Sequence, residues 1–218
     1  TTRERAREVG LEGSFLEDAV ERWRDAIERN RGCLPPDEID VFLSGGDRVD
    51  VGGRSFEAVH TPGHQKHHLC FETSIEGENV LFSGDALTGK FRSVIYHVGF
   101  AEEMYDAVGA YYAAFERLER LSVDRVYPGH GPVFTDYDDA VERSVKSLDR
   151  LIDRVEEALN EFDEASALDV ALSRADDPAT VEHTIFDTVG GLGYLEKQGK
   201  VDSYVEGGVR YFEAVDEE

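Results

Sequence analysis

The stretch HTPGHQKHH, residues 60–68, places four histidines in nine positions, in a chain that has only seven histidines in all. It overlaps the end of SFEAVH, a short run with the alternation that is typical of a β-strand, and it contains a Pro-Gly turn. A histidine cluster at the end of a strand suits a metal site, because neutral imidazole is a common metal ligand. A turn can also be rich in histidine without binding a metal, so the rest of the sequence has to decide.

Two other strand-to-loop junctions end in residues that bind metals. In FSGDAL (residues 82–87) the candidate is Asp85, and in YPGHG (residues 127–131) it is His130, as His64 is in HTPGH. In each case an apolar strand leads into a glycine, and the candidate ligand follows at once. Glycine lets the backbone turn sharply, so the next side chain can project from the sheet edge into a shared cleft. The three junctions together predict that these three residues meet at one metal site.

The same three stretches resemble the metallo-β-lactamase superfamily, and the likeness runs from about Val41 to Phe162. The resemblance implies the C-terminal portion of an αββα sandwich with a one- or two-metal centre at a sheet edge. It also implies that His64 completes the histidine set of the first metal, that Asp85 bridges both metals and that His130 binds the second. The implied cofactor is a pair of zinc ions, with iron or manganese as alternatives, and the implied chemistry is hydrolysis by a metal-bound hydroxide.

The sequence departs from this family in one respect. The motif His-x-His-x-Asp-His, which supplies most of the family's other ligands, does not occur in the 218 residues. Because the chain also lacks an initiator methionine, we expect it to be the C-terminal part of a longer protein. As given, it would hold three of the expected ligands and be inactive. A glyoxalase II-like branch of the superfamily is one option for the full-length protein.

Four more residues near the junctions are candidates for supporting the ligands or contacting substrate. His60, at the end of its strand, is interpreted as structural or supporting rather than as a ligand. His68 is expected to support the ligands or contact substrate, and a packed or solvated histidine is about equally acceptable. Tyr96 and His97 fall where members of the family line the substrate pocket, although ordinary loop residues would also fit there. No residue can be assigned as the catalytic acid or base.

The spacing of apolar residues predicts an α+β fold. A helix is predicted over residues 14–30, short β-like runs follow between Val41 and Asp85, and further helices are predicted from Glu102 and over residues 137–162. The short runs are separated by glycine-rich turns such as VGGR and EGEN. This order predicts a small sheet covered by helices.

Two domains are expected, over residues 1–162 and 163–218. In the second, two helices, the later one beginning near Asp177, precede a β-hairpin, which is the order of a winged-helix-like module. Such modules bind DNA through a basic helix in the major groove. Here the second helix mixes acidic with basic residues and contains three glycines, so packing or closure of a substrate pocket fits it better.

The net charge of −24, from 47 acidic against 23 basic residues, argues against nucleic acid and anionic membranes as partners. An acidic excess with arginine favoured over lysine resembles proteins of salt-loving archaea. The two cysteines, Cys33 and Cys70, indicate neither a disulfide framework nor a zinc knuckle. With no apolar run long enough to span a membrane and no signal segment, a cytoplasmic protein is expected.

The sequence therefore predicts a metal-dependent hydrolase that acts on an ester, thioester or lactam-like small molecule. One alternative is a metal-dependent nuclease of the same fold, although the acidic surface disfavours a polyanionic substrate. Another is a catalytically inactive fragment or a regulatory protein that uses the winged-helix part. The expected partner is a small-molecule substrate, and a homodimer is left open.

Overall fold

The computed structural model describes residues 1–33, 35–90, 95–176 and 181–215. The chain divides into two compact units, which we describe separately. The sheet unit comprises Leu43–His97 and Asp106–Ile152, and the terminal unit comprises Thr1–Phe42, Val98–Tyr105 and Asp153–Glu218. In the described parts of the chain, no helix combines the length and the apolar composition that a membrane crossing needs.

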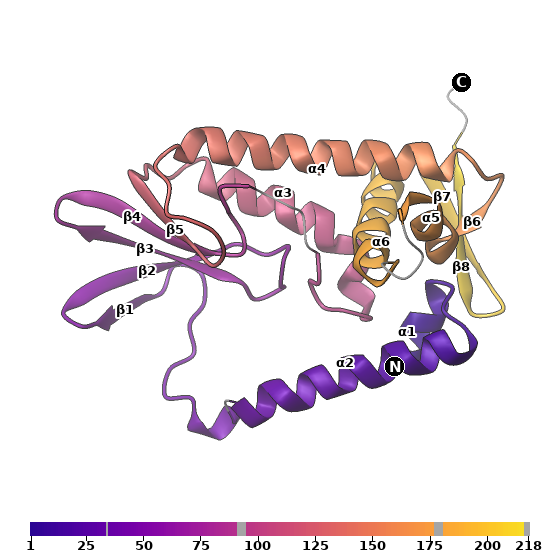
Figure 1. The fold of residues 1–218 in the computed structure, drawn as a ribbon, viewed down its shortest axis with the longest axis horizontal. Coiled ribbons are helices and arrows are strands. Elements are labelled where there is room, and N and C mark those ends of the chain that lie inside the picture. The colour runs from indigo at the N-terminus through magenta and orange to yellow at the C-terminus, as the bar shows by residue number, and fades with distance from the viewer. Residues whose placement is uncertain (34, 91–94, 177–180, 216–218) are drawn as a thin grey trace. The chain divides into compact units, whose positions relative to one another are not determined.

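The sheet unit contains a five-stranded sheet (Figure 1). Its strands lie in space in the order in which they occur along the chain, and all neighbouring pairs are antiparallel except the last, which is parallel. The strands are β1 (Arg48–Val51), β2 (Arg54–His60), β3 (Leu69–Ile75), β4 (Glu78–Gly84) and β5 (Arg125–Pro128). The predicted β-like runs between Arg48 and Asp85 form strands, but the first run, residues 41–43, forms none.

Two helices belong to the sheet unit at least in part. Helix α3 (Ala107–Leu118) lies in the crossover that joins the parallel strands β4 and β5, and α4 (Tyr137–Leu159) follows β5. The two helices contact each other, since the hydroxyl of Tyr137 donates a hydrogen bond to the carbonyl of Leu118 at 2.7 Å. The helix predicted from Glu102 begins later than expected, because Glu102–Asp106 is a 3-10 helix, η2. The long helix predicted from residue 137 is confirmed.

The terminal unit combines the N-terminal helices with the C-terminal part of the chain. Its sheet has the strand order β6-β8-β7. The predicted start of the second C-terminal helix near Asp177 lies outside the described residues. The elements are the helices α1 (Thr2–Glu8), α2 (Gly13–Cys33), η1 (Pro36–Glu38), α5 (Ala167–Arg174) and α6 (Val181–Lys197), and the strands β6 (Ala165–Ser166), β7 (Val201–Glu206) and β8 (Val209–Ala214).

The compact units do not follow the domain boundary expected from the sequence. Helix α4 belongs to the sheet unit as far as Ile152 and to the terminal unit from Asp153, and the N-terminal helices share a unit with residues 163–218. The compact units are defined by contacts in space, whereas the expected domains were defined by the sequence pattern, so the units do not test the domain boundary. The two expected domains, 1–162 and 163–218, therefore stay a prediction.

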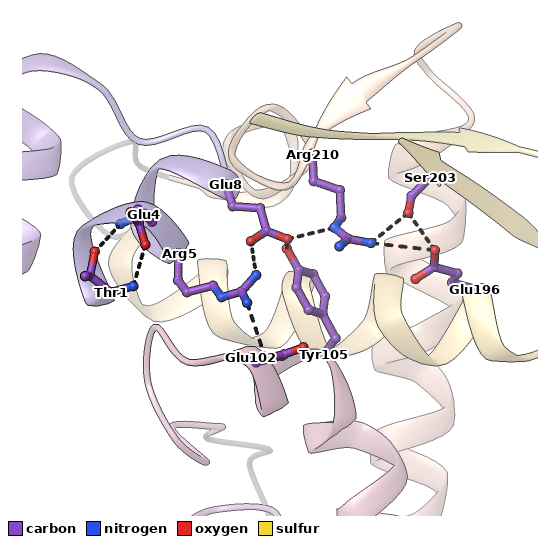
Figure 2. A network of polar contacts seen from close by, with 9 residues as sticks. All are labelled: Thr1, Glu4, Arg5, Glu8, Glu102, Tyr105, Glu196, Ser203 and Arg210. Carbon is purple, nitrogen blue, oxygen red and sulfur yellow. Dashed lines mark hydrogen bonds and ion pairs between the residues drawn. The ribbon is translucent and has the colours of Figure 1, made fainter. Parts of the chain in front are cut away.

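A buried carboxylate links three segments of the terminal unit (Figure 2). Glu8 of α1 is 7% exposed and accepts hydrogen bonds from Arg5, from Arg210 of β8 at 2.9 Å and from the Tyr105 hydroxyl of η2 at 3.3 Å. Burial by itself would raise the pKa of Glu8, but the hydrogen bonds and charges of the two arginines outweigh it and hold that pKa below its ordinary value. The carboxylate therefore stays ionised while it joins α1, η2 and β8.

Candidate metal centre

Strand direction brings the three predicted ligands to one edge of the five-stranded sheet. Strands β2 and β4 are each antiparallel to β3, and β5 is parallel to β4, so β2, β4 and β5 run in the same direction. His64 lies in the loop after β2, Asp85 directly follows β4 and His130 lies two residues after the end of β5. The carboxyl ends of these strands meet at one edge, and the three side chains meet with them.

Asp85 lies between the two histidines. Its Oδ2 is 3.4 Å from Nε2 of His64, and its Oδ1 is 3.5 Å from Nε2 of His130. The side chain of His64 is 15% exposed, that of Asp85 is 34% exposed and that of His130 is 83% exposed. Each carboxylate oxygen thus faces a different imidazole, in a site that is shielded on the His64 side and open to solvent on the His130 side.

Glycines on both sides of Asp85 allow this close approach. Gly84 has a φ of +51°, in the left-handed region that favours glycine, and a Cβ there would lie 2.7 Å from Nε2 of His68. The N–H of Gly129 donates to the carbonyl of Gly84 at 2.7 Å, and a Cβ on Gly129 would lie 2.5 Å from Oδ1 of Asp85. Gly129 therefore leaves the space that the Asp85 carboxylate occupies, and Gly84 leaves the space that the His68 ring occupies.

We expect Gly129→Ala to displace the Asp85 carboxylate and to weaken zinc binding by about 10- to 100-fold, as changes next to metal ligands do. Competition with a chromophoric chelator measures the affinity. Gly109→Ala is the matched control, because a Cβ at Gly109 meets no atom within 4 Å, and it should leave the affinity unchanged. Equal zinc affinities for Gly129→Ala and Gly109→Ala would contradict the steric argument.

His68 contacts Asp85 through the backbone. The N–H of Asp85 donates to Nε2 of His68 at 3.2 Å, so the ring carries its proton on Nδ1, which donates to Oγ1 of Thr61 at 2.8 Å. Burial, followed by the nearby His64, lowers the pKa of His68, which favours this neutral form. His68 is therefore placed to orient Asp85. This supporting role stays a prediction.

The other three candidates lie around the loop that carries His64. The ring Nε2 of His60 is 2.9 Å from the carbonyl of Lys66, which closes this loop. The backbone N–H groups of Tyr96 and His97 donate to the carbonyl of His64 at 3.2 and 2.7 Å, and the Tyr96 ring stands edge-on to the His64 ring with centroids 5.7 Å apart. These contacts hold His64 in place. Whether Tyr96 or His97 also contacts substrate stays a prediction.

Sequence reasoning missed Thr61. This residue is fully buried, and its Oγ1 contacts both Nδ1 of His68 and, at 3.2 Å, Sγ of Cys70. Burial raises the pKa of the Cys70 thiol to about 12, so Cys70 is a neutral packing residue, as expected for an idle thiol. Its position beside the Pro-Gly turn could have pointed to Thr61. Its contact with His68 depends on the pairing of β2 with β3, which the sequence pattern does not show.

The match to a protein family agrees with this arrangement. The family profile described as "Metallo-beta-lactamase superfamily" matches residues 6–130, which is more than half of the 218 residues. The chain belongs to the metallo-beta-lactamase superfamily. The matched range ends at His130 and therefore contains all three candidate ligands. The mixed sheet with its helices is the α+β fold expected from the resemblance.

Curated and solved members of the superfamily resemble the chain over different lengths. A "Beta-lactamase-like protein 2 homolog" of Caenorhabditis elegans is 30% identical over 167 residues, which are 74% of this chain and 52% of that protein. An "Atrochrysone carboxyl ACP thioesterase" of Aspergillus fumigatus is 29% identical over 120 residues, 55% of this chain and 26% of that protein. The chain thus spans about half, or less, of the length of these curated relatives.

The fold likeness extends over nearly the whole chain. The crystal structure of a beta-lactamase domain protein from Burkholderia ambifaria superposes with a TM-score of 0.76 at 21% identity, covering 95% of this chain and 60% of that one. A metallo-beta-lactamase family protein from Thermus thermophilus gives a TM-score of 0.68 at 24% identity, covering 95% of this chain and 67% of that one. At these identities the likeness establishes the fold and leaves the substrate open.

The metallo-beta-lactamase fold implies metal ions, commonly zinc, and the three residues fit such ions in part. Zinc with ligands at about 2.0–2.2 Å in a tetrahedron separates neighbouring ligand atoms by about 3.4 Å. The separations of 3.4 and 3.5 Å are close to that value. Each pair of facing atoms would therefore give a metal ion two candidate ligands from this chain. In keeping with this, no group of three or more His, Cys, Asp or Glu side chains in the described chain could hold one ion.

Proposed function

We propose that this chain supplies His64, Asp85 and His130 to the metal centre of a hydrolase that cleaves an ester, thioester or lactam-like small molecule. The observation that carries the proposal is the single carboxylate whose two oxygens each face a different imidazole. Two zinc ions are the proposed cofactors, with iron or manganese as alternatives. Further ligands beyond these three residues complete the centre.

The residues of the chain hold and orient the centre. His64 and Asp85 would hold one metal ion, and Asp85 and His130 would hold the other. Metal ions bound there would polarise a carbonyl oxygen and promote the ionisation of water at neutral pH. His68 fixes the Asp85 backbone from the buried side. Because His130 is 83% exposed, substrate would approach from its side of the site.

A thioester is the favoured substrate within this class, as it is for the glyoxalase II-like branch. The support is that a curated relative, 29% identical over 120 residues, is described as a thioesterase. A nuclease remains the rival reading, and the net charge of −24 counts against a polyanionic substrate. The same charge supports a salt-rich cytoplasm as the proposed setting.

We expect the full-length protein, supplied with zinc at high salt, to hydrolyse a thioester reporter and not a phosphodiester reporter. His64→Ala should lower the thioesterase rate by at least about 100-fold. Replacing a residue that only supports a metal ligand already lowers metal affinity or activity by about 10- to 100-fold, and loss of the ligand itself should cost more. His67→Ala changes an exposed histidine of the same stretch and should retain the rate. Hydrolysis of the phosphodiester alone would favour the nuclease, and loss of neither activity in His64→Ala would remove the metal proposal.

We further propose that residues 163–218 form a winged-helix-like domain that does not read DNA. Two helices followed by a hairpin, with the strand order β6-β8-β7, support the module. Most side chains of α6 between Ile185 and Leu195 are buried, so this helix has no free reading face there. A Cβ on Gly191 would lie 2.9 Å from Val155, and one on Gly193 would lie 2.4 Å from the carbonyl of Tyr105. These glycines serve close packing.

A further inference from the structure

The backbone that carries Asp85 lies beyond the regular pairing of β4. The last register pair of β4 with β3 joins Phe82 to Phe71, and the pairing of β4 with β5 shifts between Phe82 and Gly84. Neither Ser83 nor Asp85 has a register partner among the described strands. Buried backbone groups outside a ladder need other partners, and Ser83 is fully buried. Contacts other than strand pairing therefore hold the segment that places the proposed ligand.

Four hydrogen bonds run from Asp85 through three side chains and return to the same segment. The N–H of Asp85 donates to Nε2 of His68 at 3.2 Å, and Nδ1 of His68 is 2.8 Å from Oγ1 of Thr61. This oxygen is 3.2 Å from Sγ of Cys70, which in turn donates to the carbonyl of Ser83 at 3.3 Å. Because Ser83 lies two residues before Asp85, the bonds close a ring. We call it the Asp85 ring; its members are Thr61, His68, Cys70, Ser83 and Asp85.

Each proton in the Asp85 ring has one possible position. A backbone N–H can only donate, so Nε2 of His68 accepts, and the ring carries its proton on Nδ1 and donates it to Thr61. A carbonyl can only accept, so the Cys70 thiol uses its single proton on Ser83, and its sulfur accepts the proton of the Thr61 hydroxyl. Each of the three side chains therefore accepts one hydrogen bond and donates one, in the same direction around the ring.

Most of the Asp85 ring is shielded from water. Thr61, Cys70 and Ser83 are fully buried, and the N–H of Thr61 also donates to the carbonyl of His68 at 3.0 Å. Burial raises the pKa of the Cys70 thiol to about 12, so the proton that the ring needs stays on the sulfur. Buried hydrogen bonds in series polarise one another, and a group left there without a partner is costly. The thiol thus has a use beyond packing.

We propose that Thr61 and Cys70 are positioning residues for the metal centre and act on Asp85 from its two sides. Thr61 fixes the tautomer of His68, whose Nε2 holds the N–H of Asp85. Cys70 holds the carbonyl of Ser83, in the peptide that leads into Asp85. The orientation of this backbone decides where the carboxylate points, and therefore whether its oxygens face the two imidazoles. The inference rests on the proposed function, because it takes Asp85 as a metal ligand.

The first test examines the ring in the metal-free 218-residue chain, by nitrogen NMR of ¹⁵N-labelled histidine, which distinguishes a proton on Nδ1 from one on Nε2. We expect His68 to carry its proton on Nδ1 and to exchange it slowly with water. Thr61→Val keeps the shape of the side chain without its hydroxyl and should lose this slowly exchanging proton, whereas Thr61→Ser should keep it. A proton on Nε2 in the unaltered chain, or an unchanged signal in Thr61→Val, would overturn the inference.

The second test examines the link to the metal, by competition for zinc with a chromophoric chelator. Thr61→Val and Cys70→Ala should each weaken zinc binding by about 10- to 100-fold, as loss of a group that supports a metal ligand does. Thr61→Ser and Cys70→Ser keep a donor and an acceptor at the same place and should retain most of the affinity. Circular dichroism shows whether each variant keeps its fold, and Cys70→Ala provides the same test if Thr61→Val does not fold.

Thr73→Val is the matched control. Thr73 is 8% exposed in β3, and its hydroxyl donates to the carbonyl of Ser55 at 2.8 Å, outside the Asp85 ring. The change removes a buried hydroxyl from the same sheet and should leave both the zinc affinity and the His68 proton unaltered. Equal zinc affinities for Thr61→Val and Thr73→Val would overturn the positioning role. An unaltered chain that keeps the proton on Nδ1 of His68 but binds no zinc would instead count against the proposed function.

Discussion

Asp85→Asn is expected to weaken zinc binding by at least about 100-fold and to abolish the proposed hydrolase activity. Asp85 is the residue that both metal positions share, so its replacement removes an anionic ligand from each at once. Asparagine keeps the shape of the side chain but carries no charge. Replacing a residue that only supports a metal ligand already weakens metal binding by about 10- to 100-fold. Metal content after dialysis, together with chelator competition, measures the loss independently of activity.

Asp124→Asn provides the matched control. The carboxylate of Asp124 accepts a hydrogen bond from the backbone of Asn79, the second residue of β4, at 2.8 Å, so it lies at the opposite end of this strand from Asp85. The same chemical change there should leave zinc affinity as it is in the unaltered chain. If Asp85→Asn and Asp124→Asn bind zinc equally well, Asp85 is not a metal ligand and the proposed function fails with it.

Glu8→Gln is expected to lower the free energy of unfolding by about 3 kcal/mol, the lower end of the cost of breaking a buried ion pair. The change leaves Arg5 and Arg210, whose side chains are 31% and 26% exposed, without their shared counter-charge. Urea denaturation measures the difference. Glu17→Gln removes an exposed pair with Arg3 and should leave the free energy of unfolding essentially unchanged.

The same carboxylate predicts an acid dependence of stability. The pKa of Glu8 is lower in the folded chain than its ordinary value of 4.5, so its contribution is complete above about pH 4.5 and is lost as the pH falls through the folded-state pKa. The unfolding free energies of the unaltered chain and of Glu8→Gln should therefore converge as the solution is acidified below this value. A difference that stays constant down to pH 3 would show that the network acts through packing and not through charge.

Local patterns predicted most of the elements, because hairpins and amphipathic helices are specified by neighbouring residues. The helix from Tyr137 follows from its apolar spacing, and the hairpins follow from turns such as Gly52-Gly53, whose positive φ values favour glycine. Prediction failed in two places where the local pattern did not match the structure that formed. Residues 41–43 are apolar but form no strand, and Glu102–Asp106 continues a helical pattern yet forms a 3-10 turn.

The candidate ligands could be named from the sequence because each of them follows a strand and a glycine. The residues that hold these ligands in place could not be predicted in the same way. The hydrogen bonds from Asp85 to His68 and from His68 to Thr61 join residues that strand pairing brings together. The orientation of His64 depends likewise on Tyr96 and His97, which lie more than thirty residues further along the chain.

The sequence by itself determined which residue types stand after β2, β4 and β5, the acidic character of the surface and the family to which the chain belongs. Only the tertiary structure decided that one carboxylate lies between two imidazoles and that strand pairing aligns Phe56, Phe71, Phe82 and Tyr127 on one face of the sheet. The reason is physical: residue type and periodicity are local properties, whereas strand direction and register are fixed by pairing between segments that are distant along the chain.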